Sequence, residues 1–386
     1  MALQAEISDT SLSLYIPETM RYPDHIQRFR NAMDIIPGAP IYRQEFGFYS
    51  LEAWEEAGLP EDWKQMCMFD EPAVHSLGEL GWCEAAFCPV FEEKIIEDRG
   101  DHEVVQDFAG RHVLCFKGKR SGFMPEYLDH PVKNWKTWEE DVKWRLEPTT
   151  PQRFANLEDR MKAAQTAARQ GMVVQQGLVG GYMYLRSLIG PADLLYKFCD
   201  EPELIHDCMQ VWLRLADAIT ARHQGYLPID ILFLAEDICY NKGSLISPTM
   251  MREFLFPYYQ QLISNVRSRN HGASLKIGVD TDGLANPVIS LYQEAIGMTY
   301  MMPFEVASGC DVVEIGRQYP DLSMLGGIDK RILATSKKAI DQMLERIIPP
   351  MRERGGYIPT CDHGVPAEVP FENYLHYRQR CAELGG

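Results

Sequence analysis

The sequence lacks three features that would each place it in a particular class of proteins. None of its ten cysteines forms a Cys-x-x-Cys pair, and scattered cysteines in a chain of 386 residues are not a disulfide framework. No apolar run approaches the ~20 residues needed to span a bilayer. The first residues carry Glu6 where a signal peptide would be basic and then apolar. These absences predict a protein of the reducing cytoplasm, without a signal peptide or membrane span.

Positive charge is also scarce. The chain has 38 Lys and Arg against 55 Asp and Glu, which gives a formal net charge of -17. Nucleic acids and anionic membranes are bound through clustered positive charge, so this balance argues against both as partners. Dinucleotide and P-loop glycine motifs are missing too, because the glycine-rich run 177–181 lacks the G-x-G-x-x-G spacing.

Short apolar segments alternate with longer amphipathic ones over roughly the last 220 residues, which is typical of repeated strand–helix units. Strands that are apolar on both faces indicate a buried parallel sheet. The pattern is compatible with an open doubly wound sheet, but the number of units favours a (β/α)8 barrel. The expected strands are 41–47, 172–177, 229–235, 274–279, 298–302, 322–325 and 357–360.

One region breaks this alternation. Between residues 84 and 120, strand-like segments are joined by turns at Gly100 and Gly110, as in an antiparallel hairpin or meander. We therefore predict a single barrel domain over residues 1–386, with residues 84–120 as a β-hairpin insertion. Residues 1–20 show no periodicity and are interpreted as a loose arm or a dimer contact.

Residues able to bind metal or move protons follow three of the expected strands. Glu236 follows 229–235, Asp280 and Asp282 follow 274–279, and Cys361 and His363 lie at the end of 357–360. Parallel strands bring their carboxyl ends to one edge of the sheet, so we expect a single reaction centre there. Each residue also has a structural interpretation, as a turn former, a helix-start acid or a buried thiol.

Five segments resemble the uroporphyrinogen decarboxylase-like superfamily: 121–132, 236–238, 305–309, 326–331 and 362–366. The resemblance covers most of the chain from about residue 120. It implies a (β/α)8 barrel, often a homodimer. It also implies one of two activities, because the superfamily contains haem-pathway decarboxylases and cobalamin-dependent methyltransferases of anaerobes.

The resemblance favours the methyltransferase branch. The decarboxylases carry an Arg-Gln-Ala-Gly-Arg-Tyr motif that grips porphyrin carboxylates, and this chain has none. The methyltransferases hold zinc through His-x-Cys after a barrel strand and a later Cys. The matching positions here are Asp280-Thr281-Asp282 and His363, with Cys361 two residues earlier. Branch members that demethylate methoxylated aromatics also lack His-x-Cys, so this chain is similar to that subgroup.

The resemblance implies transfer of a methyl group from a small methylated donor, a methoxylated aromatic, to the corrinoid (methylcobalamin) of a separate corrinoid protein. A Lewis acid or a proton donor would stabilise the leaving oxygen. We predict Glu236, Asp280 and His363 as catalytic residues. A decarboxylase of a carboxylated substrate and a non-catalytic protein that binds a corrinoid or small molecule are the alternatives.

The expected metal is Zn2+, with Asp282, His363 and either Cys361 or Cys310 as ligands, since carboxylate, imidazole and thiolate all bind zinc. If the strand 357–360 continues, its alternation places Cys361 and His363 on one side. The predicted lining of an apolar pocket for an aromatic ring, with core packing as the alternative, is Tyr182, Tyr184, Arg186, Tyr240, Met301, Met302 and Phe304.

Overall fold

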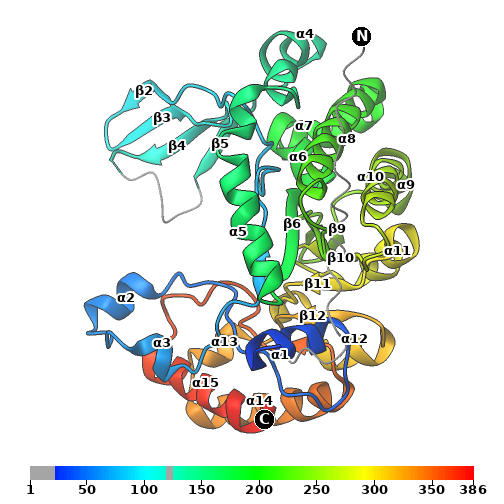
Figure 1. Cartoon of the computed structure of the whole chain (residues 1–386). Helices are drawn as coiled ribbons and strands as arrows, with labels where there is room; N and C mark the ends of the chain where they lie inside the picture. Colours follow the sequence, from blue (N-terminus) through cyan, green and yellow to red (C-terminus); the bar gives the residue numbers. More distant parts are fainter. Residues whose placement is uncertain (1–21, 119–124) are drawn as a thin grey trace, which may run out of the picture.

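The computed structural model describes residues 22–118 and 125–386. The predicted arm at residues 1–20 and the beginning of the segment 121–132 lie outside these described residues. Seven parallel strands form one curved sheet in the order β1-β6-β7-β10-β11-β12-β13 (Figure 1), which confirms the predicted fold class. The strands are β1 (Val74–Ser76), β6 (Val173–Val179), β7 (Ile231–Ala235), β10 (Lys276–Asp280), β11 (Tyr300–Met302), β12 (Ser323–Leu325) and β13 (Tyr357–Ile358).

Helices follow the strands, as the sequence pattern predicts. The longest, α8 (Pro202–Gln224), has the bounds that its apolar spacing predicts, 202–224, and it buries Leu204, Cys208, Val211 and Leu215 at helical spacing. No helix in the described part of the chain is long and apolar enough to cross a lipid bilayer. The other helices around the sheet are α5 (Leu157–Arg169), α6 (Gly181–Ile189), α7 (Pro191–Asp200), α9 (Pro248–Phe254), α10 (Phe256–Arg269), α11 (Asn286–Ile296), α12 (Val312–Gln318), α13 (Lys330–Leu333), α14 (Lys337–Arg354) and α15 (Phe371–Gly385).

The sequence pattern predicts one continuous helix over 248–268 and another over 135–146, and the structure divides both. The expected helix 248–268 consists of α9 and α10, because the backbone turns at Leu255 and Pro257 has no N–H with which to continue the ladder. The expected helix 135–146 consists of α4 (Trp135–Thr137), a π-helix and a 3-10 helix. α6 begins within the glycine-rich run 177–181 and has no predicted counterpart.

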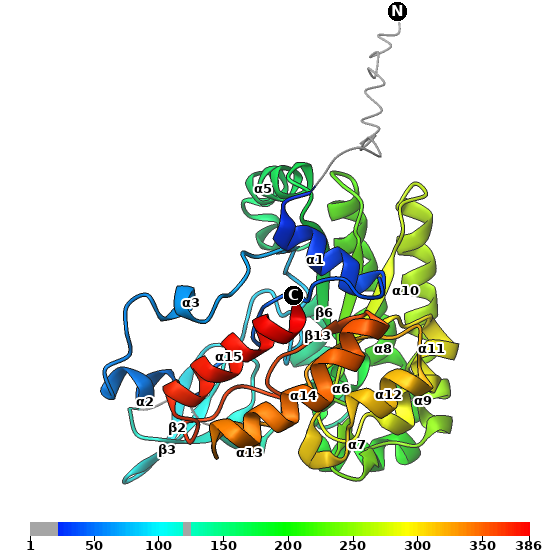
Figure 2. The same cartoon turned by 90° about the horizontal axis from the view of Figure 1, so that it is seen from below.

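Strand alternation separates residues that face the barrel axis from residues that face the helices. Ile231 and Phe233 of β7 pack in an inner cluster with residues of α1 (Asp24–Met33), whereas Leu232 packs in the main core with the helices. α1 covers the amino-terminal end of the strands (Figure 2). There the Lys276 ammonium donates to the Met33 carbonyl at 2.9 Å. The amino-terminal end of the barrel is therefore closed by α1.

The segment 41–48 lies next to β13 but is not a strand, so the prediction of a first strand at 41–47 is wrong. Its β-pairing is limited to an isolated parallel bridge between Phe48 and Val365. Side chains make some of the hydrogen bonds that a ladder would provide. Asp70 accepts from the Arg43 backbone at 2.9 Å, and Glu45 accepts from the Cys361 backbone at 2.8 Å. The first strand of the sheet is β1, which was not predicted.

A second, antiparallel sheet has the order β2-β3-β4-β5 and stands to one side of the parallel sheet (Figure 1). Val105, Val113 and Cys115 form its own small core. Arg111 ties it to the loop after β1, donating to Glu84 at 2.9 Å. Strand β5 extends this sheet past residue 120. The strands are β2 (Lys94–Arg99), β3 (His102–Gln106), β4 (His112–Phe116) and β5 (Glu126–Asp129).

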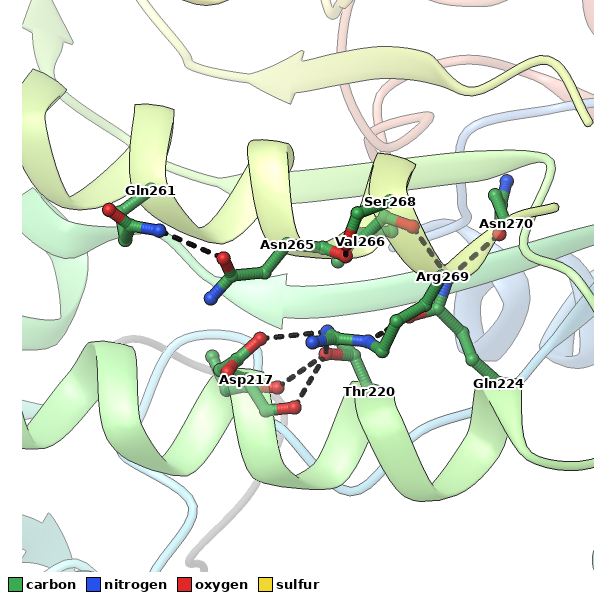
Figure 3. A network of polar contacts seen from close by, with 10 residues as sticks. Asp217, Thr220, Gln224, Gln261, Asn265, Val266, Ser268, Arg269 and Asn270 are labelled. Carbon is green, nitrogen blue, oxygen red and sulfur yellow. Dashed lines mark hydrogen bonds and ion pairs between the residues drawn. The ribbon is translucent and has the colours of Figure 1, made fainter. Parts of the chain in front are cut away.

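A polar network joins the carboxyl-terminal ends of α8 and α10 (Figure 3). The Arg269 guanidinium donates to Gln224 at 2.8 Å and to Asp217 at 2.7 Å. Asn270 accepts from the Gln224 amide at 2.8 Å and donates to the Ile229 carbonyl at 2.7 Å, just before β7. These bonds fix the start of β7 and belong to the scaffold at the closed end of the barrel.

Candidate active site

His363 and Asp282 meet at the carboxyl ends of the strands, although they come from loops far apart in the sequence. Asp282 follows β10 and His363 follows β13, and the imidazole Nε2 lies 3.6 Å from a carboxylate oxygen. The Asp282 carboxylate raises the pKa of His363 above its usual value. Phe46 and Tyr49 flank the imidazole, with ring centroids at 5.2 and 5.7 Å. The pair is partly solvent-exposed, so it can meet a ligand and exchange protons.

Asp280 faces the barrel axis beside this pair. It lies on the same side of β10 as Gly278, where an added Cβ would meet the rings of Phe233 and Tyr300. Burial, Asp282 and Asp237 raise the pKa of Asp280 well above its usual value. A neutral carboxyl group is therefore favoured at this position. Its neighbours along the mouth include Asp237, which is paired with Arg186 at 2.5 Å.

Glu236 does not reach the mouth, although it was predicted as a catalytic residue. Strand alternation turns its side chain toward α6 and α10, where it is fully buried. The carboxylate accepts from the Tyr259 hydroxyl at 2.7 Å and from the Tyr182 backbone, in the first turn of α6, at 3.1 Å. A Cβ at Gly180 would lie 2.1 Å from this carboxylate, which explains the glycine. Glu236 therefore anchors α6 from behind the sheet.

Burial raises the pKa of Glu236 from 4.5 to about 7, which predicts a pH-dependent stability. The folded state favours the neutral carboxyl, so the contribution of Glu236 is complete below pH 4.5 and is lost as the pH rises through about 7. Relative to Glu236→Gln, the wild-type free energy of unfolding should fall by on the order of 2–3 kcal/mol from pH 4.5 to 8. Urea unfolding of both proteins over this pH range measures the difference in the free energy of unfolding. A difference that stays constant with pH would contradict the prediction.

The structure does not bring the four predicted zinc ligands together. The Cys310 thiol donates to the Gly283 carbonyl at 3.4 Å, and the Cys361 thiol is buried in the main core. After β13 the chain makes one more parallel bridge, between Cys361 and Ile328, and then bends at 362–364, so Cys361 does not share a side with His363. Nowhere among residues 22–118 and 125–386 do three His, Cys, Asp or Glu side chains lie where they could hold a metal ion. This arrangement does not fit a zinc site.

Most of the predicted pocket lining belongs to the core. Tyr182, Tyr184, Met301 and Phe304 are buried in the main core with the helices. Met301 lies in the core because of strand alternation. Its neighbours on β11, Tyr300 and Met302, face the barrel axis, so Met301 faces outward to the helices. Arg186 and Tyr240 do lie at the accessible end of the barrel, and Met302 packs partly exposed against the inner cluster.

An aromatic stack that sequence reasoning missed lies inside the mouth. Trp82 stacks on Phe233 with centroids 5.6 Å apart and planes 14° apart, and Phe233 contacts Tyr300 at 5.6 Å. Trp82 is 43% exposed, so one part of the stack is open to solvent. The signal in the sequence was Trp82 itself, six residues beyond Ser76, but β1 was not recognised as a strand.

A further ion pair lies at the rim of the mouth, where the Lys330 ammonium is 3.2 Å from the Glu305 carboxylate.

A model of the uroporphyrinogen decarboxylase (URO-D) family matches residues 126–384. The chain belongs to the uroporphyrinogen decarboxylase family. This confirms the resemblance read from the sequence and places nearly all of the parallel sheet, together with His363 and Asp282, within the matched region.

Individual relatives of this URO-D family chain are distant. Uroporphyrinogen decarboxylases of Geobacter metallireducens and Geobacter sulfurreducens are 25% and 23% identical over 175 residues, which is 45% of this chain and 49% of each relative. The chain thus matches about half the length of these curated relatives. A solved methyltransferase from Methanosarcina mazei is similar with a TM-score of 0.56 at 11% identity, covering 94% of this chain and 99% of that one. Identity this low shows a shared fold.

Proposed function

We propose that this URO-D family protein is a methyltransferase that takes a methyl group from a small methylated aromatic and passes it to a corrinoid protein. The observation that carries the proposal is the His363–Asp282 pair, in which a carboxylate favours the protonated imidazole at an accessible strand end. The aromatic stack beside it offers a surface for a planar donor. The methyltransferase fold of the Methanosarcina mazei protein supports the same assignment.

In this mechanism the residues of the chain hold the donor and supply a proton. Trp82 and Phe233 contact the aromatic ring, and His363 donates a proton to the ether oxygen as the bond between oxygen and methyl breaks. Asp282 stabilises the imidazolium before transfer. The corrinoid of the partner supplies the nucleophile that accepts the methyl group. The balance is methyl ether plus Co(I) plus one proton giving phenol plus methyl–Co(III).

The charges at the mouth disfavour the decarboxylase alternative. A tetrapyrrole with many carboxylates needs unpaired cations in the cleft. Of the described residues, Arg186 is paired with Asp237 at 2.5 Å and Lys330 with Glu305 at 3.2 Å. Asp280 adds an acidic group to the same rim. The mouth therefore offers such a substrate little positive charge.

Free cob(I)alamin can stand in for the partner in a direct test. We expect the purified protein, mixed under anaerobic conditions with cob(I)alamin and methoxylated aromatics, to form methylcobalamin and the corresponding phenol. The absorbance change of the corrinoid and chromatography of the phenol measure the two products. Release of CO2 from uroporphyrinogen with no methylcobalamin from any donor would overturn the proposal in favour of a decarboxylase.

A further inference from the structure

Asp280 is the unpaired acid of the mouth. Its neighbours have partners: Asp237 pairs with Arg186, Asp282 with His363 at 3.6 Å and Glu305 with Lys330. In the described part of the chain, no hydrogen-bond donor or cation is paired with the Asp280 carboxyl, and the charged groups acting on it are the carboxylates Asp237 and Asp282. A ligand that carries a cation and a hydrogen-bond donor would give this inward-facing carboxyl the partners that the described residues do not provide.

The aromatic stack lies directly below this carboxyl. Gly278 precedes Asp280 by two residues on the same side of β10, and its missing side chain leaves room for Phe233 and Tyr300. Trp82 covers Phe233. Cys83, the next residue, is electrostatically coupled to both Asp237 and Asp280, so the loop after β1 approaches the same acids. Two residues along a strand span roughly 6–7 Å, which an ammonium group on a short arm of an aromatic ring can reach.

We propose that this site binds a positively charged aromatic methyl donor, with its ammonium group against Asp280 and its ring against Trp82. This inference rests on the proposed function and names the substrate class. A cation supplies the counter-ion that Asp280 lacks, and an aromatic face attracts the same charge. A carboxylate in that place would lie beside Asp237, Asp280 and Asp282 and would gain no counter-ion from them, so anionic donors are expected to bind most weakly.

Three ligands of similar shape and different charge test the inference by binding alone. They are 4-methoxybenzylamine, 4-methoxybenzyl alcohol and 4-methoxybenzoate, titrated into the full chain at pH 7 without corrinoid and followed by calorimetry. We expect the ammonium to bind about tenfold more tightly than the alcohol and the benzoate to bind most weakly. Equal affinities, or tightest binding of the benzoate, would overturn the proposal.

Asp280→Asn replaces a carboxyl that can become a carboxylate beside a cation with an amide of nearly the same shape. In this variant the affinity for 4-methoxybenzylamine should fall to within about threefold of the affinity for 4-methoxybenzyl alcohol. The affinity for the alcohol itself should not change. Asp341→Asn is the matched control, because Asp341 lies on α14 and pairs with His376 at 2.8 Å; it should preserve the order of affinities. If Asp280→Asn does not fold, Trp82→Leu provides the second test, and it should bind all three ligands more weakly than the wild-type protein. Unchanged affinities in whichever of the two variants folds would overturn the proposal.

The binding test also separates this inference from the proposed function. If the affinities follow the expected order but no donor transfers its methyl group to cob(I)alamin, the proposed ligand site stands and the proposed methyltransferase function is refuted. Transfer from the alcohol and the benzoate at the rate of the ammonium would refute the ligand class and keep the methyltransferase.

Discussion

Substitution of His363 by alanine is expected to lower the rate of methyl transfer by about 100-fold or more, the usual size of a lost general acid. Asp282 favours the protonated form of this imidazole at the accessible end of the barrel. The His363 side chain is only 25% exposed and packs against Phe46 and Tyr49, so the variant is compared with the wild-type protein under conditions in which both are folded. Initial rates with cob(I)alamin measure the effect, and urea unfolding of the same preparations establishes those conditions.

His376→Ala is the matched control for this substitution. His376 is also paired with an aspartate, Asp341, and its side chain is 27% exposed, but it lies on α15 away from the strand ends. We expect this variant to keep the wild-type rate. Equal rates for His363→Ala and the wild-type protein would show that His363 is not the acid.

Asp282→Asn gives a readout that a merely structural role would not produce. Without the carboxylate the pKa of His363 falls, because the charge that favours the imidazolium is gone. An acid is active below its pKa, so the decline of the rate with increasing pH should begin at lower pH in the variant. A lower rate at every pH, with the decline still beginning at the wild-type pH, would contradict the role of Asp282.

Arg378→Met is expected to cost about 3–5 kcal/mol of unfolding free energy, because it leaves a buried carboxylate without its cation. Arg378 and Glu45 are almost completely buried, with nitrogen and oxygen 4.0 Å apart. Glu45 also accepts from the Tyr374 hydroxyl at 2.9 Å and from the Cys361 backbone at 2.8 Å. The pair therefore links α15, the segment 41–48 and the loop that leads to His363.

Two comparisons test the origin of this loss by urea unfolding. The double variant Glu45→Gln with Arg378→Met removes both charges. Its loss of unfolding free energy should be smaller than the sum of the losses in the two single variants. Arg380→Ala, an exposed arginine on the same helix, should leave the unfolding transition nearly unchanged. Strict additivity of the two single variants would show that the buried ion pair has no special role.

The positions that sequence reasoning located correctly are those governed by local pattern. Six of the strands of the parallel sheet and the bounds of α8 followed from apolar spacing and from turn residues. The expectation that Asp282 and His363 meet followed from a rule of topology, since parallel strands end at one edge. The family followed from short motifs at those same ends.

The side to which each strand-end residue points could not be obtained from the sequence, because it depends on where each strand stops. β7 keeps its alternation through Ala235, which turns Glu236 outward to Tyr259. The pairing after β13 persists to Cys361, whose thiol faces the core, and the bend at 362–364 then turns His363 to the mouth. A difference of one residue in register reverses the assignment of a catalytic or structural role.

Composition and motif spacing alone determined that this is an acidic α/β chain with ionisable residues at the carboxyl ends of parallel strands. Tertiary structure alone decided which of those groups are available. Asp237, Asp282 and Glu305 acquire partners from other elements, whereas Asp280 has none in the described residues. Pairing between residues that are distant in sequence depends on packing geometry, and that geometry decides which of the acids at the strand ends have a counter-ion.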